Sequence, residues 1–172
     1  GQGAGYHAAW DSFADFGAAA ALATGTARGG GASGRGQMIS FRELIGKARE
    51  ACMSEPVFSD GAVVTGDFDS DGQRDILFMW DKVRCPNATT AVPSVGAGFC
   101  GMHNCSVDVY LSSVYQPGGW PQALLSHMEI PIEVSEGNRP TFKTFFSGGK
   151  CAFSEICETI WRFDGTKMAP QR

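Results

Sequence analysis

The pattern of hydrophobic and polar positions changes along the chain, from helical spacing in the first third to strand-like alternation in the rest. From residue 62 onward, short runs rich in β-branched and aromatic residues are separated by turns that contain glycine and proline, which is typical of strands. The predicted strands span residues 63–67, 76–80, 107–112, 120–127, 130–134, 141–146, 159–163 and 167–169. Because the connections are short, neighbouring strands should be antiparallel.

Two of these strands carry more specific expectations. Val107, Val109 and Leu111 alternate with Asp108, Tyr110 and Ser112, so this strand should be half-buried, with one side in the core and the other in solvent. Near the end of the chain, the pair Asp164-Gly165 follows an alternating run and predicts a hairpin turn.

A helix is predicted to begin at Ser40 and to end before Pro56. The sequence Ser40-Phe-Arg-Glu43 fits a capping box, in which the serine caps the first turn and the glutamate bonds back to it. Apolar residues then recur on one side of the helix, at Phe41, Leu44, Ile45, Ala48 and Cys52. Because that side must be buried, the helix should pack against another element.

The first 37 residues have a different composition. Residues 6–23 carry apolar side chains at helical spacing, and residues 25–37 are glycine-rich, as in a flexible linker. We therefore divide the chain into an N-terminal segment, residues 1–37, and a β-rich domain, residues 38–172. Either the rest of the fold or a partner protein should hold this segment, and we favour a partner. The expected partner-binding residues are Trp10, Phe13, Gly17, Arg28 and Arg35.

The expected architecture is α+β and mostly β. We predict a twisted antiparallel sheet of about six or seven strands, with one packed helix and an N-terminal helical extension. A chain of 172 residues is long enough for one such domain.

Charge and hydropathy exclude two classes of function. The net charge of −4 and the pI near 5.3 do not favour a nucleic-acid surface, which needs a basic face. No apolar run approaches the ~20 residues of a membrane span. The sequence starts at Gly1 rather than methionine, so we expect a mature or trimmed product, which removal of a signal peptide would fit.

Acidic residues are concentrated in the segment from Asp67 to Asp75, which has aspartate at positions 67, 69, 71 and 75 and glycine at position 72. Carboxylates this close repel one another, and Ca²⁺ relieves the repulsion because it takes six to eight oxygen ligands. The predicted ligands are Asp67, Asp69, Asp71, the backbone carbonyl of Gln73, and Asp75 directly or through water. Gly72 should supply the backbone conformation that bends the loop around the ion.

This loop begins like an EF-hand but does not end like one, because its twelfth position is Phe78 rather than glutamate. The flanking residues, 61–66 and 76–80, predict strands. The pattern D-x-D-x-D-G-x-x-D resembles the strand–loop–strand calcium sites of FG-GAP and integrin-type propeller repeats. That resemblance implies an ion that ties a hairpin together and does no chemistry. The alternative is a solvated acidic turn without an ion.

The six cysteines favour an oxidising compartment, because their number is even and none forms a C-x-x-C motif. Six cysteines allow fifteen pairings, and we predict Cys100–Cys105, Cys151–Cys157 and Cys52–Cys85. The last pair would join the helix to the strand that leaves the calcium hairpin. Reduced thiols in a cytosolic protein are the alternative.

The order of these features resembles that of a group of small exported bacterial proteins. In this sequence the matching motifs are the loop 67–75, Cys85, the C-G-x-x-x-C cluster at 100–105, the strand 107–112, the pair Cys151 and Cys157, and residues 161–165. The match covers roughly residues 50–170. It implies export and calcium binding, while the group carries no agreed activity.

The sequence provides less support for a copper or zinc site or for a catalytic site. The soft ligands at 100–105 would suit copper or zinc, but a small disulfide loop explains them more simply. There is no G-x-S-x-G motif, and an even cysteine count leaves no free thiol nucleophile. The carboxylates that a hydrolase would need are Glu129, Glu133, Glu155 and Glu158, which the alternating pattern places outward.

The function that these observations favour is non-catalytic. We expect a calcium-stabilised domain, periplasmic or extracellular, that acts as a structural or accessory subunit and docks through its N-terminal segment on a larger envelope or extracellular assembly. The alternatives are an inhibitor or immunity-type module, which would bind a secreted enzyme through a loop such as 86–104, and an envelope hydrolase.

Overall fold

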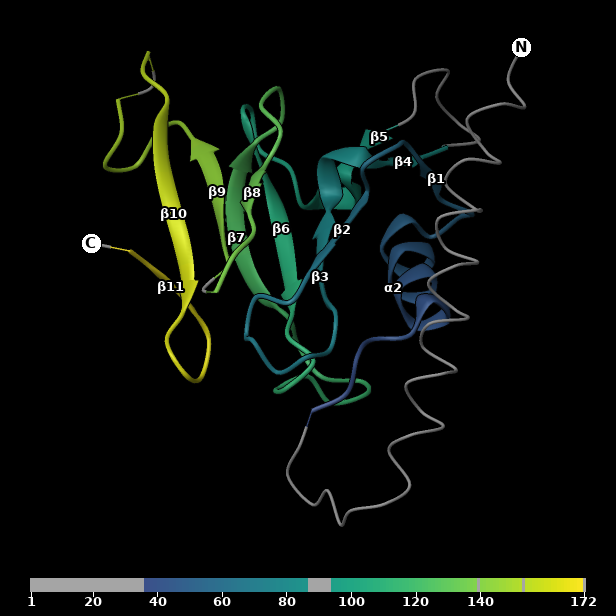
Figure 1. Ribbon diagram of the computed structural model, residues 1–172. Coiled ribbons are helices and arrows are strands. Elements are labelled where there is room, and N and C mark those ends of the chain that lie inside the picture. The colour runs from purple at the N-terminus through teal and green to yellow at the C-terminus, as the bar shows by residue number, and fades with distance from the viewer. Residues whose placement is uncertain (1–35, 87–93, 139, 153, 172) are drawn as a thin grey trace.

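The computed structural model describes residues 36–86, 94–138, 140–152 and 154–171. In that part of the chain the fold is mostly β with a single α-helix, as predicted, and Figure 1 shows its arrangement. The predicted helix at 6–23, and with it Trp10, Phe13, Gly17, Arg28 and Arg35, lies outside the described residues.

The helix α2 spans Phe41–Cys52, and the serine half of the predicted capping box forms. The Glu43 carboxylate, which the sequence predicts to bond back to Ser40, accepts hydrogen bonds from Tyr115 and Gly118 instead. Ser40 has an extended conformation, and its hydroxyl accepts a hydrogen bond from the backbone N–H of Glu43 at 3.1 Å. The helix ends where Met53 adopts a left-handed conformation. Leu44 and Ala48, on the predicted apolar side, are buried.

The strands form three antiparallel sheets rather than the one sheet that the sequence predicts. The central sheet has the order β2-β3-β6-β7 and the outer sheet the order β11-β10-β9-β8, while a small sheet has the order β1-β4-β5. The bounds are β1 Val57–Phe58, β2 Val63–Gly66, β3 Asp75–Met79, β4 Val83–Cys85, β5 Ser94–Val95, β6 Asn104–Tyr110, β7 Gln122–His127, β8 Glu133–Ser135, β9 Thr141–Phe146, β10 Cys157–Phe163 and β11 Met168–Pro170. Two short 3-10 helices, η2 (Trp80–Lys82) and η3 (Gly96–Gly98), complete the described elements.

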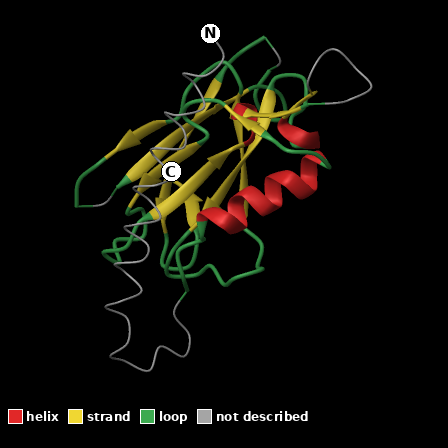
Figure 2. Cartoon of the chain, turned by 90° about the vertical axis from the view of Figure 1, so that its right-hand side faces the viewer, coloured by secondary structure: helices red, strands yellow, loops and turns green. Residues whose placement is uncertain are grey.

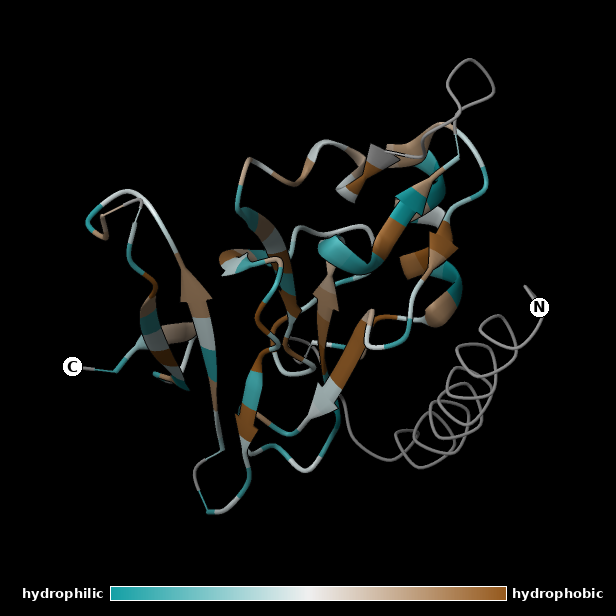
Figure 3. Ribbon diagram, turned by 90° about the horizontal axis from the view of Figure 1, so that it is seen from above, coloured by the Kyte–Doolittle hydropathy of each residue, from teal (hydrophilic) through white to brown (hydrophobic). Residues whose placement is uncertain are grey.

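The division into sheets follows from two hydrophobic clusters, one on each face of the central sheet. Ile76 and Phe78 of β3 pack with α2 in the first cluster. Leu77 and Met79 point the other way, into a cluster that includes Phe142 of the outer sheet. The protein therefore has three layers, α2, central sheet and outer sheet (Figures 1 and 2). Figure 3 shows the same arrangement from above, with hydrophobic stretches, drawn in brown, on several strands.

Burial on both faces corrects the prediction for β6. Asp108, Tyr110 and Ser112 are not solvent-facing, because only 7%, 2% and 1% of their surfaces are exposed. Tyr110 packs in the cluster beneath α2, and the side chain of Trp80 donates a hydrogen bond to Asp108 at 2.8 Å. The strand is central, and the helix covers the side that the alternating pattern assigned to water.

The six cysteines form the three predicted disulfides, Cys52–Cys85, Cys100–Cys105 and Cys151–Cys157. The first joins the last residue of α2 to the last residue of β4. Cys85 follows the β2–β3 hairpin through η2 and lies in the small sheet rather than in the central one. This bridge fixes the helix to the β layers.

Candidate metal centre

The loop between β2 and β3 is the place where the acidic side chains gather. The two strands pair antiparallel with Gly66 opposite Asp75, so the intervening residues form a loop at the end of a ribbon. Gly72 has a φ of +83°, a left-handed conformation that glycine adopts without steric cost. The loop therefore turns at the glycine that the sequence singled out.

Phe68 anchors this loop to the core. Its ring is 2% exposed and packs edge-to-face against Phe142 of the outer sheet, with the ring centroids 5.2 Å apart. Gly66 permits this position, because a Cβ atom there would lie 2.7 Å from the Phe68 ring. Burial of the aromatic side chain holds the flanking Asp67 and Asp69 in place.

Three of the predicted ligands come together. Asp67, Asp69 and Asp71 each offer a carboxylate oxygen, and these oxygens lie within 4.8 Å of one another. Asp69 is 9% exposed, whereas Asp71 is exposed and Asp67 is half-buried. The alternating spacing thus brings three carboxylates to one side of the loop, as the sequence predicts.

Backbone N–H groups hold these carboxylates in position. Asp67 accepts hydrogen bonds from the backbone N–H of Asp71 at 3.1 Å and from that of Gly72 at 2.9 Å. Asp69 accepts a bond from Ser113 N–H at 3.2 Å, and Asp71 accepts one from Gln73 N–H at 2.8 Å. The geometry is therefore fixed by the protein before any ligand is considered.

No basic side chain neutralises the cluster in the part of the chain that the structure describes. Arg74, within the same loop, instead donates a hydrogen bond to the Thr65 hydroxyl at 3.1 Å. Partial burial raises the pKa of the Asp71 carboxyl, and the neighbouring Asp69 contributes to the rise. The three carboxylates are thus close together and electrostatically unfavourable as they stand.

Asp75 occupies a different position from the other three aspartates. It is fully buried, and one of its oxygens accepts hydrogen bonds from the backbone N–H of Phe68 at 2.6 Å and of Asp69 at 3.1 Å. The other oxygen accepts bonds from Ser112, from its N–H at 2.7 Å and its hydroxyl at 2.8 Å. Burial raises the pKa of Asp75 to about 7, against the effect of the Ser112 bonds. Asp75 therefore anchors the loop to the end of β6.

Ser112 and Ser113 are part of the site although sequence reasoning did not find them. The Ser112 hydroxyl also contacts Asp71, at 2.8 Å, and Ser113 N–H contacts Asp69. They lie about forty residues further along the chain, and nothing in the strand motif at 107–112 connects its last residue, Ser112, with the acidic loop. Only the pairing of β3 with β6 brings them to the loop.

A hard divalent cation fits this donor set. Three carboxylates without a basic partner, arranged around a glycine turn, supply the charged oxygen ligands that Ca²⁺ or Mg²⁺ prefers. Asp67, Asp69 and Asp71 would hold the ion. The carbonyl of Gln73 and the carboxylate of Asp75 stay predictions, and Asp75 already uses both of its oxygens within the protein.

The other candidates from the sequence do not form a second carboxylate cluster among the described residues. Glu155 lies beside Cys151 and Cys157, but these two sulfurs are joined in a disulfide and offer no thiolate. Glu129, Glu133, Glu155 and Glu158 are exposed, as the alternation predicts. Glu133 and Glu158 both lie near Lys143, at 3.7 and 3.2 Å. Cys100 and Cys105 are bonded to each other and offer no thiolate to copper or zinc. Much of the predicted inhibitory loop, residues 87–93, lies outside the described residues.

No family model, curated protein or solved structure matches this chain. The acidic cluster and the paired cysteines that suggested FG-GAP-like proteins are present. No helix in the described ranges is long and apolar enough to cross a membrane. Three disulfides are typical of a protein from an oxidising compartment.

Proposed function

We propose that this protein is an exported, non-catalytic domain in which Ca²⁺ locks the β2–β3 ribbon, and that it acts as an accessory subunit of a larger envelope or extracellular assembly. The ion would serve as it does in the strand–loop–strand sites of FG-GAP repeats, as a structural clamp. The positive charge of the ion offsets the repulsion among the carboxylates of Asp67, Asp69 and Asp71.

The cluster of three carboxylates carries this proposal. Their oxygens lie within 4.8 Å of one another and have no basic partner among the described residues. The same loop is tied to β6 through Ser112 and to the outer sheet through Phe68. Neutralising the loop would therefore stabilise the junction between both sheets, which is a structural rather than a chemical role.

Equilibrium dialysis against Ca²⁺ tests the ion directly. We expect one ion per chain for the wild type and none for the double variant Asp67→Asn/Asp69→Asn, because two charged ligands are lost. Asp60→Asn is the matched control, since Asp60 is exposed and lies outside the cluster. Dialysis that gives the same calcium content for the wild type and the double variant would refute the assignment.

Docking through the N-terminal segment is tested by truncation. The N–H of Gly36 donates to Ser113 O at 2.9 Å, and the N–H of Gln37 donates to Tyr115 O at 2.7 Å, so the cut belongs before Gly36. A chain that lacks residues 1–35 should fold and should lose its partner in pull-down experiments from its native host. A truncated chain that retains the partner, or that does not fold, contradicts the proposed division.

Export is tested by the oxidation state of the cysteines in the cell. Rapid alkylation of intact cells should leave all six cysteines unlabelled, because each is in a disulfide. Free thiols in the native protein would instead indicate a reducing compartment.

A further inference from the structure

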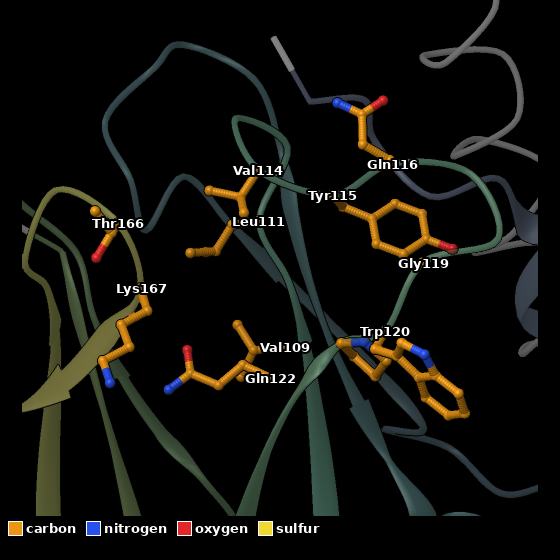
Figure 4. Close-up of a pocket in the computed structure, with 11 residues that line it drawn as sticks. Val109, Leu111, Val114, Tyr115, Gln116, Gly119, Trp120, Gln122, Thr166 and Lys167 are labelled. Atoms are coloured by element: carbon orange, nitrogen blue, oxygen red, sulfur yellow. The ribbon is translucent and has the colours of Figure 1, made fainter. Parts of the chain in front are cut away.

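A cavity of about 430 Å³ lies between the central sheet and the β10–β11 hairpin, and none of the clustered aspartates lines it. This volume is in the range of ligand-binding pockets. Figure 4 shows Val109, Leu111 and Gln122 in the middle of the cavity, with Lys167 at one end. Tyr115 and Trp120 lie at the opposite end. The cavity therefore has an aromatic end, an apolar floor and a basic end.

The aromatic end is exposed to an unusual degree. Trp120 is 93% exposed and Val114, another lining residue, is 51% exposed. A large apolar side chain in water is unfavourable by about 25 cal/mol per Å² of exposed surface. Exposed tryptophan is also the residue type most enriched at the energetic centres of interfaces. An apolar group placed against Trp120 would remove this surface from water.

Both walls of the cavity are fixed by contacts within the protein. On one side Glu43 of α2 accepts hydrogen bonds from the Tyr115 hydroxyl and from Gly118 N–H, the latter at 2.8 Å, and Lys47 donates to Gly119 O at 3.1 Å. On the other side the Gln122 amide donates to Met168 O at 2.7 Å and accepts from Met168 N–H at 2.9 Å. Because the walls are held, a ligand meets little of the cost of ordering them.

Among the described residues that line the cavity, Lys167 supplies the cationic group. The amide of Gln122 is occupied by Met168, and Thr166 donates to Asp164 through both its N–H and its hydroxyl. The Lys167 ammonium forms no ion pair within 4.0 Å among the described residues, and no carboxylate lines the cavity. Its charge does act on the nearby Asp164 carboxyl, whose pKa is lowered mainly by hydrogen bonds from Lys167 N–H and Thr166 and to a smaller extent by the Lys167 ammonium. Asp164, in the same hairpin, is held by the backbone N–H of Thr166 and Lys167.

We propose that this cavity, which we call the Trp120 groove, binds an extended segment of a partner protein that carries a bulky apolar side chain followed or preceded at a short distance by a carboxylate. The apolar side chain packs against the exposed Trp120, beside the small exposed part (5%) of Tyr115, and the carboxylate pairs with Lys167. Figure 4 shows the Trp120 and Lys167 side chains at opposite ends of the cavity, so the apolar group and the carboxylate of the ligand would occupy different ends. The inference is independent of the metal ion.

A protein segment suits the groove better than the alternatives. A fatty acid would leave its alkyl chain in water along the open side on which Trp120 lies. A peptide covers such an open groove with backbone as well as side chains. The groove also adjoins the point at which the N-terminal segment enters the domain, since Gly36 and Gln37 bond to Ser113 and Tyr115. A partner that is held by the N-terminal segment would therefore pass beside it.

A peptide array tests the groove with the full-length chain. The array consists of acetylated, amidated hexapeptides in which one bulky apolar residue and one glutamate change position, together with the same peptides carrying glutamine in place of glutamate. The wild type should bind a subset of the glutamate peptides at least ~10-fold more tightly than their glutamine counterparts, which is about 1.4 kcal/mol. Bound peptides should protect Trp120 from iodide quenching of fluorescence.

Three variants decide the outcome. Trp120→Ala should lose binding to both sets, and Lys167→Gln should bind both sets equally. Lys150→Gln, an exposed lysine outside the groove, should behave as the wild type. Thermal unfolding checks that each variant folds. We expect all three to fold, because none of the replaced side chains lies in the core.

The proposal is overturned if no peptide binds, or if Lys167→Gln keeps the preference for glutamate. It is also overturned if dodecanoate protects Trp120 while the peptides do not, which would indicate a lipid site. Concentration-dependent dimerisation that is lost in Trp120→Ala would instead assign the groove to a second copy of this chain.

Discussion

Asp75 is a buried carboxylate whose accepted hydrogen bonds join two segments that are distant in sequence. Its two oxygens accept hydrogen bonds from the backbone N–H groups of Phe68, Asp69 and Ser112 and from the hydroxyl of Ser112. All of these partners are donors, so the site is shaped for an acceptor with two oxygens. Such a buried carboxylate matters to stability mainly because its loss would leave these buried donors without an acceptor.

The substitution Asp75→Asn tests this role. The amide NH₂ would replace one acceptor oxygen and face donors, and we expect the free energy of unfolding to fall by about 2–3 kcal/mol. Urea denaturation measures the change, and Asp60→Asn, at an exposed position, should be nearly neutral. A loss no larger than that of the control would contradict the anchoring role.

Asp108 predicts a pH dependence of stability. Burial raises the pKa of this carboxyl, although the Trp80 hydrogen bond and the charge of Lys47 oppose the rise. Its folded-state pKa thus exceeds the unfolded value of about 4. Between these two values the folded protein binds more protons than the unfolded chain. The contribution of Asp108 to the free energy of unfolding therefore decreases as pH rises through this interval.

The variant Asp108→Asn checks the sign of this effect. Asparagine keeps an oxygen that accepts the Trp80 bond but does not titrate. The variant should lose less stability than the wild type as pH increases from about 4. The measurement is urea denaturation at a series of pH values, and identical slopes for both proteins would refute the assignment.

The helix α2 contributes to the fold in two ways at the scale of elements. Its buried side packs on the central sheet, and its polar residues hold the loop between β6 and β7. The sequence predicts the cap at Ser40, which the structure confirms. The carboxylate of Glu43, however, bonds to Tyr115 and Gly118, which are 72 and 75 residues away. A capping-box pattern contains no information about so distant a partner.

Replacing Glu43 with alanine should therefore do more than weaken a cap. The Tyr115 hydroxyl and Gly118 N–H would lose their acceptor, and we expect a loss of about 1–3 kcal/mol in the free energy of unfolding. Glu50→Ala, on the exposed side of the same helix, is the matched control and should change stability by less than about 0.5 kcal/mol. Equal effects in the two variants would contradict the proposed contact between helix and loop.

At the scale of the whole molecule, three layers meet at β3, a strand that is buried on both faces. Periodicity predicted the helix, most of the strands and the carboxylate loop, because each depends on residues close in sequence. It did not predict that α2 and the outer sheet cover opposite faces of the central sheet, or that Ser112 reaches the loop. Both features depend on packing between segments that are distant in sequence. The alternation of apolar and polar residues does not report such packing, and at Asp108 it predicted a solvent-facing side chain that is in fact buried.

The Cys52–Cys85 disulfide predicts a further stability effect at this scale. It closes a loop of sequence separation 33, compared with 5 for Cys100–Cys105. Replacing both Cys52 and Cys85 by alanine should cost about 3–4 kcal/mol on the chain-entropy account, against about 2 kcal/mol for the Cys100 and Cys105 pair. Thermal unfolding of the two double variants compares them, and the reverse order of stability would contradict this account.

Thermal unfolding in calcium and in chelator tests the central claim most directly. At free Ca²⁺ about 100-fold above the dissociation constant, binding adds about 2.7 kcal/mol of stability, so the wild-type Tm should rise by about 5–11 °C. Asp67→Asn/Asp69→Asn should show no rise between chelator and calcium, whatever its Tm in chelator, because two charged ligands are lost. A wild-type Tm that is the same in calcium and in chelator would contradict the calcium clamp.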